Sequence, residues 1–404
     1  MRRRFLGETG GTVTVFARLS CVSVLTALGA VMLPLEAFAQ AGASGLEGAS
    51  MARCSAEDGM NLCAAGPFAL RFYGADGTLR SLAASSDKEA DYLPWRLDGR
   101  RQGNGFAHLG DIDFRLKSAG SPRWKDFSSW HAKRPVRELP AEGNVLRQDE
   151  ITPSLGAGFP LRVRRVWRLA GQGLVLEFSV ANPGRQSVQV GGMGFPLVFG
   201  NDFTDETLDD AHKHEVFVDP AIARDGGYIQ VTRMSGAGPV LLGMPEGRTP
   251  LEVYRPLVEA PAGSAGKADV LAEATPRSQT FEGFYDWMPA SAGFADQEWQ
   301  KAGSQWNAPT QFTLKPGETR TFGVRFAFAP NVRGIEQTLA THARPVAVSL
   351  PGYVVPEDLP ATLYLHSAQA VRSFSVEPKG ALNVSPEGAH GVWQRYRVGG
   401  KTWG

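Results

Sequence analysis

The residues best suited to chemistry lie between residues 281 and 306, where aromatic rings and carboxylates occur close together. Apolar sugar faces stack on aromatic rings, and carboxylates accept hydrogen bonds from sugar hydroxyls, so this composition favours a carbohydrate-binding surface. The candidate residues, including one histidine from an earlier segment, are Tyr285, Trp287, Trp299, Trp306, Glu282, Asp286 and His212. The alternative is that the rings belong to the core, because large aromatic side chains dominate core burial.

A second cluster combines aspartates and histidines between residues 202 and 215. If this segment is a strand, His212 and His214 share one face, because side chains alternate along a strand. Together with Asp209 and Asp210 they could bind Zn²⁺ or Ca²⁺. Their spacing matches no established metal motif, so we expect no cofactor. The alternatives are a solvated loop and a loop that hydrogen-bonds a glycan.

Several carboxylates could take part in glycoside cleavage, which needs two carboxyl groups about 5–9.5 Å apart, one of them with a raised pKa. The candidates are Asp202, Asp205, Glu282, Asp286, Asp296 and Glu298. The sequence contains no Gly-x-Ser-x-Gly elbow, phosphate-binding loop or dinucleotide fingerprint. It therefore identifies no specific catalytic residue.

The elements that would position these residues are predicted to be β-strands. Residues 68–82 and 161–180 each alternate polar and apolar side chains on both sides of a turn, which predicts two hairpins. The 47 glycines and 27 prolines also favour many turns and an all-β fold. Arg165 interrupts the alternation of Arg162, Arg164 and Arg168, so we expect a bulge there on a solvated strand face. The aromatic segment 281–306 is expected to be mostly irregular.

The last quarter of the chain begins with a predicted helix over residues 331–340, which Asn331 can cap and Pro345 ends. From Val346 onward, alternating segments predict strands again and indicate the first part of an Ig-like sandwich. The sequence stops at Gly404, just after a Gly-Gly turn, with no closing strand. We therefore expect a truncated product of a longer gene.

The N-terminal residues 1–39 have the features of an export signal. Three arginines open the chain, an apolar run follows, and Ala37-Phe38-Ala39 provides a cleavage pattern. The signal is either twin-arginine-like or of the general secretory type, so we expect a periplasmic or secreted protein. Cys54 and Cys63 are expected to form a disulfide in that oxidising compartment.

The composition excludes other classes of protein. The chain has 404 residues, enough for about two or three domains, and a net charge of +1. A nucleic-acid-binding protein would show a strong basic excess, so we expect no nucleic acid partner. No segment after the signal has the ~18 uninterrupted apolar residues of a membrane helix, so we expect no membrane association after cleavage.

Several longer blocks of the sequence resemble a secreted family of unknown function that is associated with six-hairpin glycosidase-like proteins. The resemblance covers about residues 68–404, and its blocks are Asp225–Arg233, Gly247–Tyr254, Phe281–Trp287, Trp306–Thr310, Arg344–Val348 and Pro351–Val354. It implies an N-terminal β-supersandwich, a linking helix, an Ig-like module and then an (α/α) toroid that holds the catalytic acids. The toroid is missing from this chain, so the resemblance implies no catalytic residue here.

These observations predict an all-β protein with a large antiparallel β-supersandwich, a linking helix and a partial Ig-like β-sandwich. We assign residues 1–39 to the signal peptide, 40–63 to a flexible leader, 64–330 to the supersandwich, 331–344 to the helix and 345–404 to the partial sandwich. The predicted function is that of a non-catalytic, carbohydrate-facing region of a polysaccharide-degrading protein. Its partners would be a poly- or oligosaccharide and a missing C-terminal catalytic domain. The alternatives are a complete glycoside hydrolase or lyase using carboxylates of the 202–210 and 282–298 loops, and a structural module that packs on a partner domain.

Overall fold

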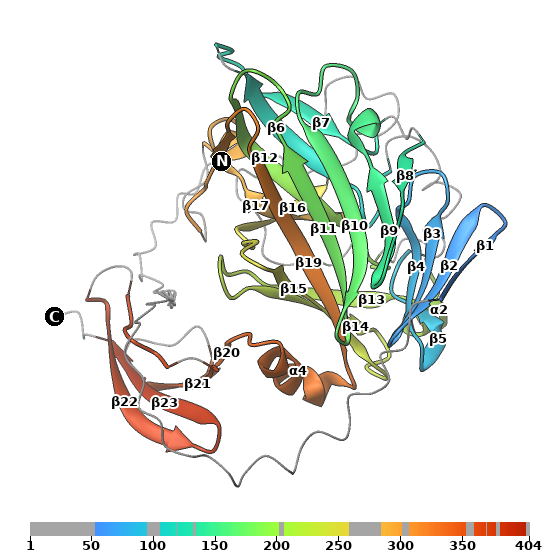
Figure 1. Ribbon diagram of the computed structural model, residues 1–404. Helices are drawn as coiled ribbons and strands as arrows, with labels where there is room; N and C mark the ends of the chain where they lie inside the picture. Colours follow the sequence, from blue (N-terminus) through green and yellow to red (C-terminus); the bar gives the residue numbers. More distant parts are fainter. Residues whose placement is uncertain are drawn as a thin grey trace, which may run out of the picture. The chain divides into compact units, whose positions relative to one another are not determined.

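The computed structural model describes residues 53–94, 106–118, 120–131, 135–201, 206–257, 284–300, 307–352, 359–368, 370–376 and 380–400. These residues form two compact units, one that extends to Ile335 and one that begins at Glu336. Antiparallel strands dominate both units, which confirms the predicted all-β class (Figure 1). The predicted signal peptide lies outside the described residues.

The first unit contains an eight-stranded sheet in which a strand from late in the sequence lies between two runs of consecutive strands. Its spatial order is β13-β14-β15-β19-β11-β10-β9-β8. The strands are β8 (Arg137–Leu139), β9 (Val145–Glu150), β10 (Arg162–Ala170), β11 (Gly173–Ala181), β13 (Val216–Ala221), β14 (Tyr228–Arg233), β15 (Val240–Glu246) and β19 (Thr319–Ala329). Strand β19 thus lies between β11 and β15, and all pairings are antiparallel (Figure 1).

Two smaller sheets complete this unit. The six-stranded sheet has the path β16-β17-β12-β6-β7 with β18 paired to β12, and consists of β6 (Asp113–Ser118), β7 (Lys125–Ser128), β12 (Val188–Leu197), β16 (Val253–Leu257), β17 (Phe284–Ala290) and β18 (Phe312–Leu314). The five-stranded sheet consists, in spatial order, of β1 (Arg53–Glu57), β2 (Met60–Ala65), β3 (Phe68–Tyr73), β4 (Leu79–Ala84) and β5 (Asp87–Asp91). The short helices are η1 (Thr152–Leu155), α2 (Leu208–His214), α3 (Ala292–Ala295), η2 (Val332–Gly334) and α4 (Ile335–Thr341).

One hydrophobic core joins the three sheets of the first unit. Phe178 of β11 stacks on Phe195 of β12 at 5.2 Å, which packs the eight-stranded sheet against the six-stranded one. Phe72 of β3 meets the edge of Trp167 of β10 at 5.5 Å, which packs the five-stranded sheet against the same core. Aromatic pairs of this kind contribute large buried areas, so they fix the separation of the sheets.

Both predicted hairpins are confirmed. Strands β3 and β4 pair on either side of the turn at residues 74–77, and β10 and β11 pair in continuous register from Arg162 to Ala170. Cys54 and Cys63 face each other across β1 and β2 and form the predicted disulfide. The part of the predicted leader that the structure describes forms this hairpin. Asn331 caps η2 by accepting a hydrogen bond from the Gly334 amide.

Three local predictions are wrong. The β10–β11 register runs through Arg165 without a bulge, and the Arg165 side chain is buried among polar groups instead of solvated. Residues 284–290 were expected to be irregular but form β17, because pairing with β12 and β16 supplies their main-chain hydrogen bonds. His212 and His214 lie on helix α2 and not on a strand. Residues two apart on a helix point in different directions, so they do not share a face.

The second unit contains one four-stranded antiparallel sheet in the order β20-β21-β23-β22. Its strands are β20 (Val346–Leu350), β21 (Ala361–His366), β22 (Leu382–His390) and β23 (Trp393–Gly400). The Ig-like identity of this unit stays a prediction. Throughout the part of the chain that the structure describes, no helix combines the length and hydropathy needed to cross a lipid bilayer.

Candidate functional site

The aromatic residues predicted to stack on sugars are buried. Trp287 has no exposed surface, and its indole nitrogen donates to the Pro250 carbonyl at 2.8 Å. Tyr285 belongs to the main core, and Trp299 stacks on Phe294 at 5.6 Å. A buried ring has no free face for a ligand, so these three residues do not form the predicted stacking surface. Strand alternation explains the burial of Tyr285 and Trp287, because both point to the core side of β17.

The other predicted residues are scattered. Asp286 is fully buried, whereas His212 is exposed on α2. Trp306, Glu282, Asp202 and Asp205 lie outside the described residues. Among the residues that are described, no group of three or more His, Cys, Asp or Glu side chains could hold a metal ion.

Helix α2 shows how the second cluster is arranged. The Thr207 hydroxyl accepts from the Asp210 amide and caps the helix, and it donates to the Asp210 carboxylate at 2.6 Å. Asp209 and Asp210 occupy the first turn, where carboxylates are favoured by the helix dipole. Helix capping and the helix dipole therefore account for the presence of both aspartates in the first turn of α2.

A polar row crosses the outer face of the six-stranded sheet, on the side opposite the main core. Arg255 of β16 pairs with Asp286 of β17, and Asp286 pairs with residue 196 of β12. Gly194, two residues earlier on β12, pairs with Asp113 of β6. Paired residues in antiparallel strands point to the same side, so these side chains gather on one face. Arg115 lies two residues after Asp113 and therefore on that face as well.

Two carboxyl groups of this row share one guanidinium. Arg255 Nη2 donates to Asp113 Oδ2 at 2.6 Å and to Asp286 Oδ2 at 2.5 Å. Burial raises the pKa of Asp113, an effect that Arg255 opposes. Burial also raises the pKa of Asp286 well above its ordinary value, and the negative charge of Asp113 raises it further. Two adjacent buried carboxyl groups therefore ionise less readily than isolated ones.

Gly194 lets the two carboxyl groups approach each other. A Cβ atom at this position would lie 2.9 Å from the carboxyl carbon of Asp286 and closer still to Asp113 Oδ1. Such distances are shorter than van der Waals contact, so only glycine fits between β6 and β17 here. The site is thus formed by the strands β6, β12, β16 and β17. The absence of a side chain at Gly194 leaves room for the polar groups of the neighbouring strands to approach each other.

A second guanidinium binds two further carboxylates. Arg115 donates to both oxygens of Asp126 at 2.7 and 2.8 Å and to Glu298 Oε1 at 2.6 Å. Phe294 lies between the two arginines, with its ring centre 3.8 Å from Arg115 Cζ and 4.4 Å from Arg255 Cζ. Cation–π contacts at these distances hold both guanidinium groups in place. Asp126 and Glu298 keep about half or more of their side-chain surface exposed, at 63% and 51%.

A cavity of about 270 Å³ opens beside these residues. Its wall combines charged groups with aromatic and polar ones, among them Asp113, Arg115, Asp126, Ser128, Trp130, His131, Arg255, Phe284 and Glu298. Ser128 Oγ lies 2.5 Å from His131 Nδ1. The cavity therefore offers hydrogen-bond acceptors, a hydroxyl, an imidazole and apolar ring surface within one small space.

Glu252 fixes the segment that supplies one side of the cavity. Its buried carboxylate accepts hydrogen bonds from the Ser291 hydroxyl and from both the amide and the hydroxyl of Thr310, the amide at 2.9 Å. Asn307 donates to the Glu252 carbonyl at 2.8 Å. Burial raises the pKa of Glu252, and these hydrogen bonds oppose the shift. Helix α3, with Phe294 and the following Glu298, is thereby anchored to the strand β16.

Part of this site was predicted from the sequence. Asp286 and Glu298 were among the candidate acids, but Asp113, Arg115 and Arg255 were missed. The signal for the first two was the alternation of charged and apolar residues over 111–116, which places Asp113 and Arg115 on one face. Arg255 offered no signal of its own, because its partner Asp286 is 31 residues away in the sequence.

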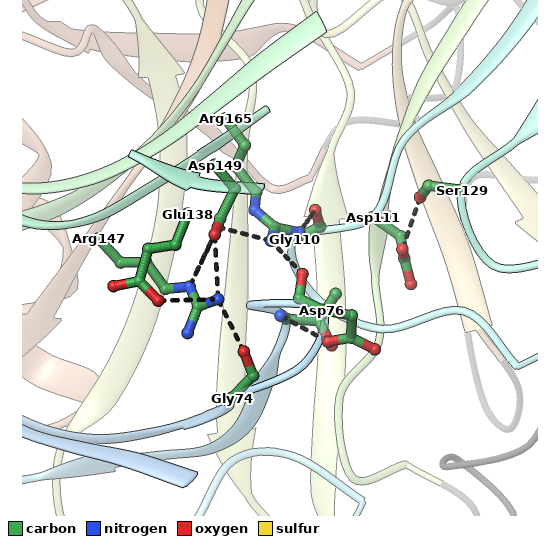
Figure 2. A network of polar contacts seen from close by, with 10 residues as sticks. Gly74, Asp76, Gly110, Asp111, Ser129, Glu138, Arg147, Asp149 and Arg165 are labelled. Carbon is green, nitrogen blue, oxygen red and sulfur yellow. Dashed lines mark hydrogen bonds and ion pairs between the residues drawn. The ribbon is translucent and has the colours of Figure 1, made fainter. Parts of the chain in front are cut away.

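A separate polar network lies inside the first unit, and Figure 2 shows its contacts. The buried Asp149 carboxylate accepts from Arg147 Nε at 3.0 Å and from Arg165 Nη2 at 2.8 Å. Arg147 also donates to the Gly74 carbonyl at 3.0 Å, and Arg165 to the Gly110 carbonyl at 2.7 Å. These main-chain contacts connect the β3–β4 turn and the segment before β6 to the eight-stranded sheet, which indicates a structural role.

The chain has a fold similar to that of part of a solved polysaccharide lyase. The polysaccharide lyase BACCELL_00875 superposes with a TM-score of 0.56 at 14% identity, over 86% of this chain and 44% of the lyase. This chain thus corresponds to less than half the length of that lyase, and the similarity shows a shared fold. No curated protein sequence matches the chain.

Two further structures match less well. A putative aldose 1-epimerase from Escherichia coli K12 has a TM-score of 0.34 at 10% identity, over 69% of this chain and 99% of that one. The GH36 alpha-galactosidase AgaB from Geobacillus stearothermophilus has a TM-score of 0.35 at 10% identity, over 71% and 42%. These scores support no conclusion about this chain.

A protein family matches most of the sequence. The match extends over residues 71–404 and therefore includes the candidate site, most of the first unit and the second unit. The chain belongs to this family, the Family of unknown function DUF5695.

Proposed function

We propose that this chain is a carbohydrate-binding β region of an exported polysaccharide-degrading protein, and that the cavity beside Asp126 and Glu298 is its binding site. The observation that carries the proposal is the composition of that cavity, which places exposed carboxylate oxygens next to the half-buried ring of Phe284. Sugars need both kinds of surface, because their hydroxyls donate to carboxylates and their C–H faces contact rings.

The two exposed carboxylates have the geometry that hydroxyl recognition needs. Arg115 holds Asp126 through both oxygens and Glu298 through one. Each carboxylate oxygen has two lone pairs, so both groups keep acceptor capacity for a ligand. Their orientation is fixed before binding, which lowers the entropic cost of association.

The catalytic groups of the whole protein would be supplied by a further domain. The fold match to less than half of a polysaccharide lyase supports this part of the proposal, as does the absence of a recognised catalytic motif in the sequence. Export by the N-terminal signal and association with a six-hairpin toroid belong to the same proposal. Both follow from the sequence patterns and the family resemblance.

Acid-assisted glycoside cleavage by this chain itself is a second candidate function. The observation in its favour is Asp113, a carboxyl group with a raised pKa that reaches the cavity wall. A protonated carboxyl can donate to the leaving oxygen of a glycosidic bond. If this function is present, Asp113→Asn abolishes release of reducing sugar by the full chain, whereas Glu177→Gln leaves it unchanged.

Binding measurements on the full-length chain test the first function. A glycan array identifies ligands, and calorimetry then compares wild type with Asp126→Asn and Glu298→Gln. Each substitution removes one charged acceptor, so we expect affinity to fall roughly 10- to 100-fold, as for loss of about 1.5–3 kcal/mol. Glu177→Gln is the matched control, because Glu177 also pairs with an arginine but on the eight-stranded sheet. Unchanged affinity in both cavity variants would reject this site.

A further inference from the structure

The charged groups around the cavity are unequal in number. Among the described residues, two guanidinium groups and four carboxyl groups meet at the outer face of the six-stranded sheet. They are Arg115, Arg255, Asp113, Asp126, Asp286 and Glu298. Without any bound proton, the fixed charges of this cluster sum to −2. A single proton on the buried pair Asp113–Asp286 would change this sum to −1, so the cluster is acidic in either case.

Both arginines are already paired with carboxyl groups of the cluster. Arg115 uses all three guanidinium nitrogens, since Nη1 also donates to the Gly293 carbonyl at 3.2 Å. Arg255 is engaged by Asp113 and Asp286 through Nη2, and its Nε is buried. Recognition of a carboxylate or sulfate normally uses a free guanidinium fork. An anionic sugar that bound the paired guanidinium nitrogens would have to displace Asp113, Asp126, Asp286 or Glu298.

The two exposed carboxylates add direct repulsion. Asp126 and Glu298 are the most accessible charged groups of the cluster, and both are negative. A second carboxylate within a few ångströms would be destabilised by like-charge interaction, whereas a hydroxyl would be attracted as a donor. At about 270 Å³ the cavity is slightly smaller than the ~300–1,000 Å³ of sites for drug-sized ligands, which suits one sugar ring.

From this arrangement we infer that the cavity selects a neutral, hydroxyl-rich sugar unit and excludes uronic acid and sulfated units. The inference rests on the proposed carbohydrate-binding function and specifies its substrate class. The selectivity comes from carboxylates that already neutralise both arginines and leave surplus acceptors for hydroxyl groups.

A panel of oligosaccharides tests this inference when each uronate-containing member is compared with its carboxyl-reduced form. The two forms share a backbone and differ in the charged group, so their affinity ratio for the full chain reports charge selectivity. We expect the reduced form to bind at least ~10-fold more tightly at low salt, and the ratio to shrink at high salt because screening weakens the repulsion. Glu298→Gln should reduce the ratio several-fold, whereas Glu177→Gln should leave it unchanged.

The possible failures are distinguishable. Equal or tighter binding of the uronate form would overturn the selectivity while leaving carbohydrate binding intact. If no member of the panel binds in either form, although the protein is folded by circular dichroism, the proposed function itself fails and the inference fails with it. A ratio that does not respond to Glu298→Gln would assign the selectivity to other groups and overturn the role of the exposed carboxylates.

Discussion

At the scale of single residues, the pair Asp113–Asp286 is the most unusual feature of the molecule. Both side chains are buried, and Arg255 bridges them from a neighbouring strand. Buried ion pairs often contribute little net stability, because desolvation offsets the Coulomb attraction. The pKa values of both carboxyl groups are raised in the folded protein, so its stability depends on pH.

The substitution Asp286→Asn tests the raised pKa of this carboxyl group. The folded-state pKa of Asp286 is raised from 3.8, so the stability that its protonated form contributes is fully present below that pH and is lost as pH rises through the raised value. An amide mimics the protonated acid, so the variant should gain stability relative to wild type as the pH rises above the ordinary pKa of an aspartate, about 4. Urea unfolding at a series of pH values measures the difference. A constant difference would show that the pKa of Asp286 is not raised.

The substitution Gly194→Ala tests the close approach of the two carboxyl groups. The new Cβ would overlap Asp113 and Asp286, so we expect a loss of about 1–3 kcal/mol in the free energy of unfolding. Gly243→Ala is a matched control in a strand of the same unit, since its Cβ would have no neighbour closer than 3.6 Å. Its effect should stay within about 0.5 kcal/mol. Similar losses in both variants would contradict the steric argument.

At the scale of elements, strand β17 explains which of the predicted site residues lie in the core and which lie near the cavity. Its alternation sends Tyr285 and Trp287 into the core and Asp286 to the outer face. The residue types were recognised from the sequence but the strand was not, because β17 pairs with β12 and β16, which end at Leu197 and Leu257, and neither is joined to it by a short turn. Hairpins such as β3–β4 and β10–β11 were predictable, since their partners follow directly after a turn.

The same limit applies to the other arginines. The local sequence pattern predicted that Arg165 lies on a solvated face. Its partner Asp149 lies 16 residues earlier in the sequence, so the local pattern does not reveal this contact. Arg115 and Glu298 are 183 residues apart. A local pattern predicts the face on which a side chain lies, whereas its partners depend on the order of strands in the sheet. The candidate site was therefore only partly predictable.

Removing the Glu252 carboxylate tests whether α3 is positioned by one anchor. Glu252→Ala leaves the Ser291 hydroxyl and the Thr310 amide without a buried acceptor, so we expect a loss of about 1–3 kcal/mol per unsatisfied group. Hydrogen exchange over residues 291–300 should accelerate, and ligand affinity should fall because Glu298 loses its position. Glu252→Gln retains an oxygen acceptor and should recover much of both effects. Equal exchange in Ala and Gln variants would argue against the anchor.

At the scale of the whole molecule, the network in Figure 2 joins sheets that are distant in sequence. Asp149 lies on β9 of the eight-stranded sheet, while Arg147 and Arg165 reach main-chain carbonyls at positions 74 and 110. All of these contacts belong to the first unit. The network thus helps to hold the five-stranded sheet against the rest of that unit.

We expect Asp149→Asn to destabilise this unit strongly. The change removes the buried carboxylate that two guanidinium groups share and leaves Arg147 only the exposed carboxylate of Glu138 at 3.6 Å, so we expect a cost of about 3–5 kcal/mol in the free energy of unfolding. Chemical denaturation measures the loss. Glu177→Gln breaks a more exposed ion pair with Arg168 and should cost about 1 kcal/mol or less. A loss below about 1 kcal/mol for Asp149→Asn would show that the remaining contacts of Arg147 and Arg165 stabilise both guanidinium groups without the Asp149 carboxylate.

The position of β19 has a consequence for the order in which the protein can fold. This strand lies between β11 and β15, yet it is the last of the eight to be synthesised. Until Ala329 has left the ribosome, the growing chain exposes the unpaired edges of two hydrophobic strands. Folding that depends on such distant pairing is slow, and open strand edges favour aggregation. A nascent chain of this protein therefore needs protection from self-association until β19 has been synthesised.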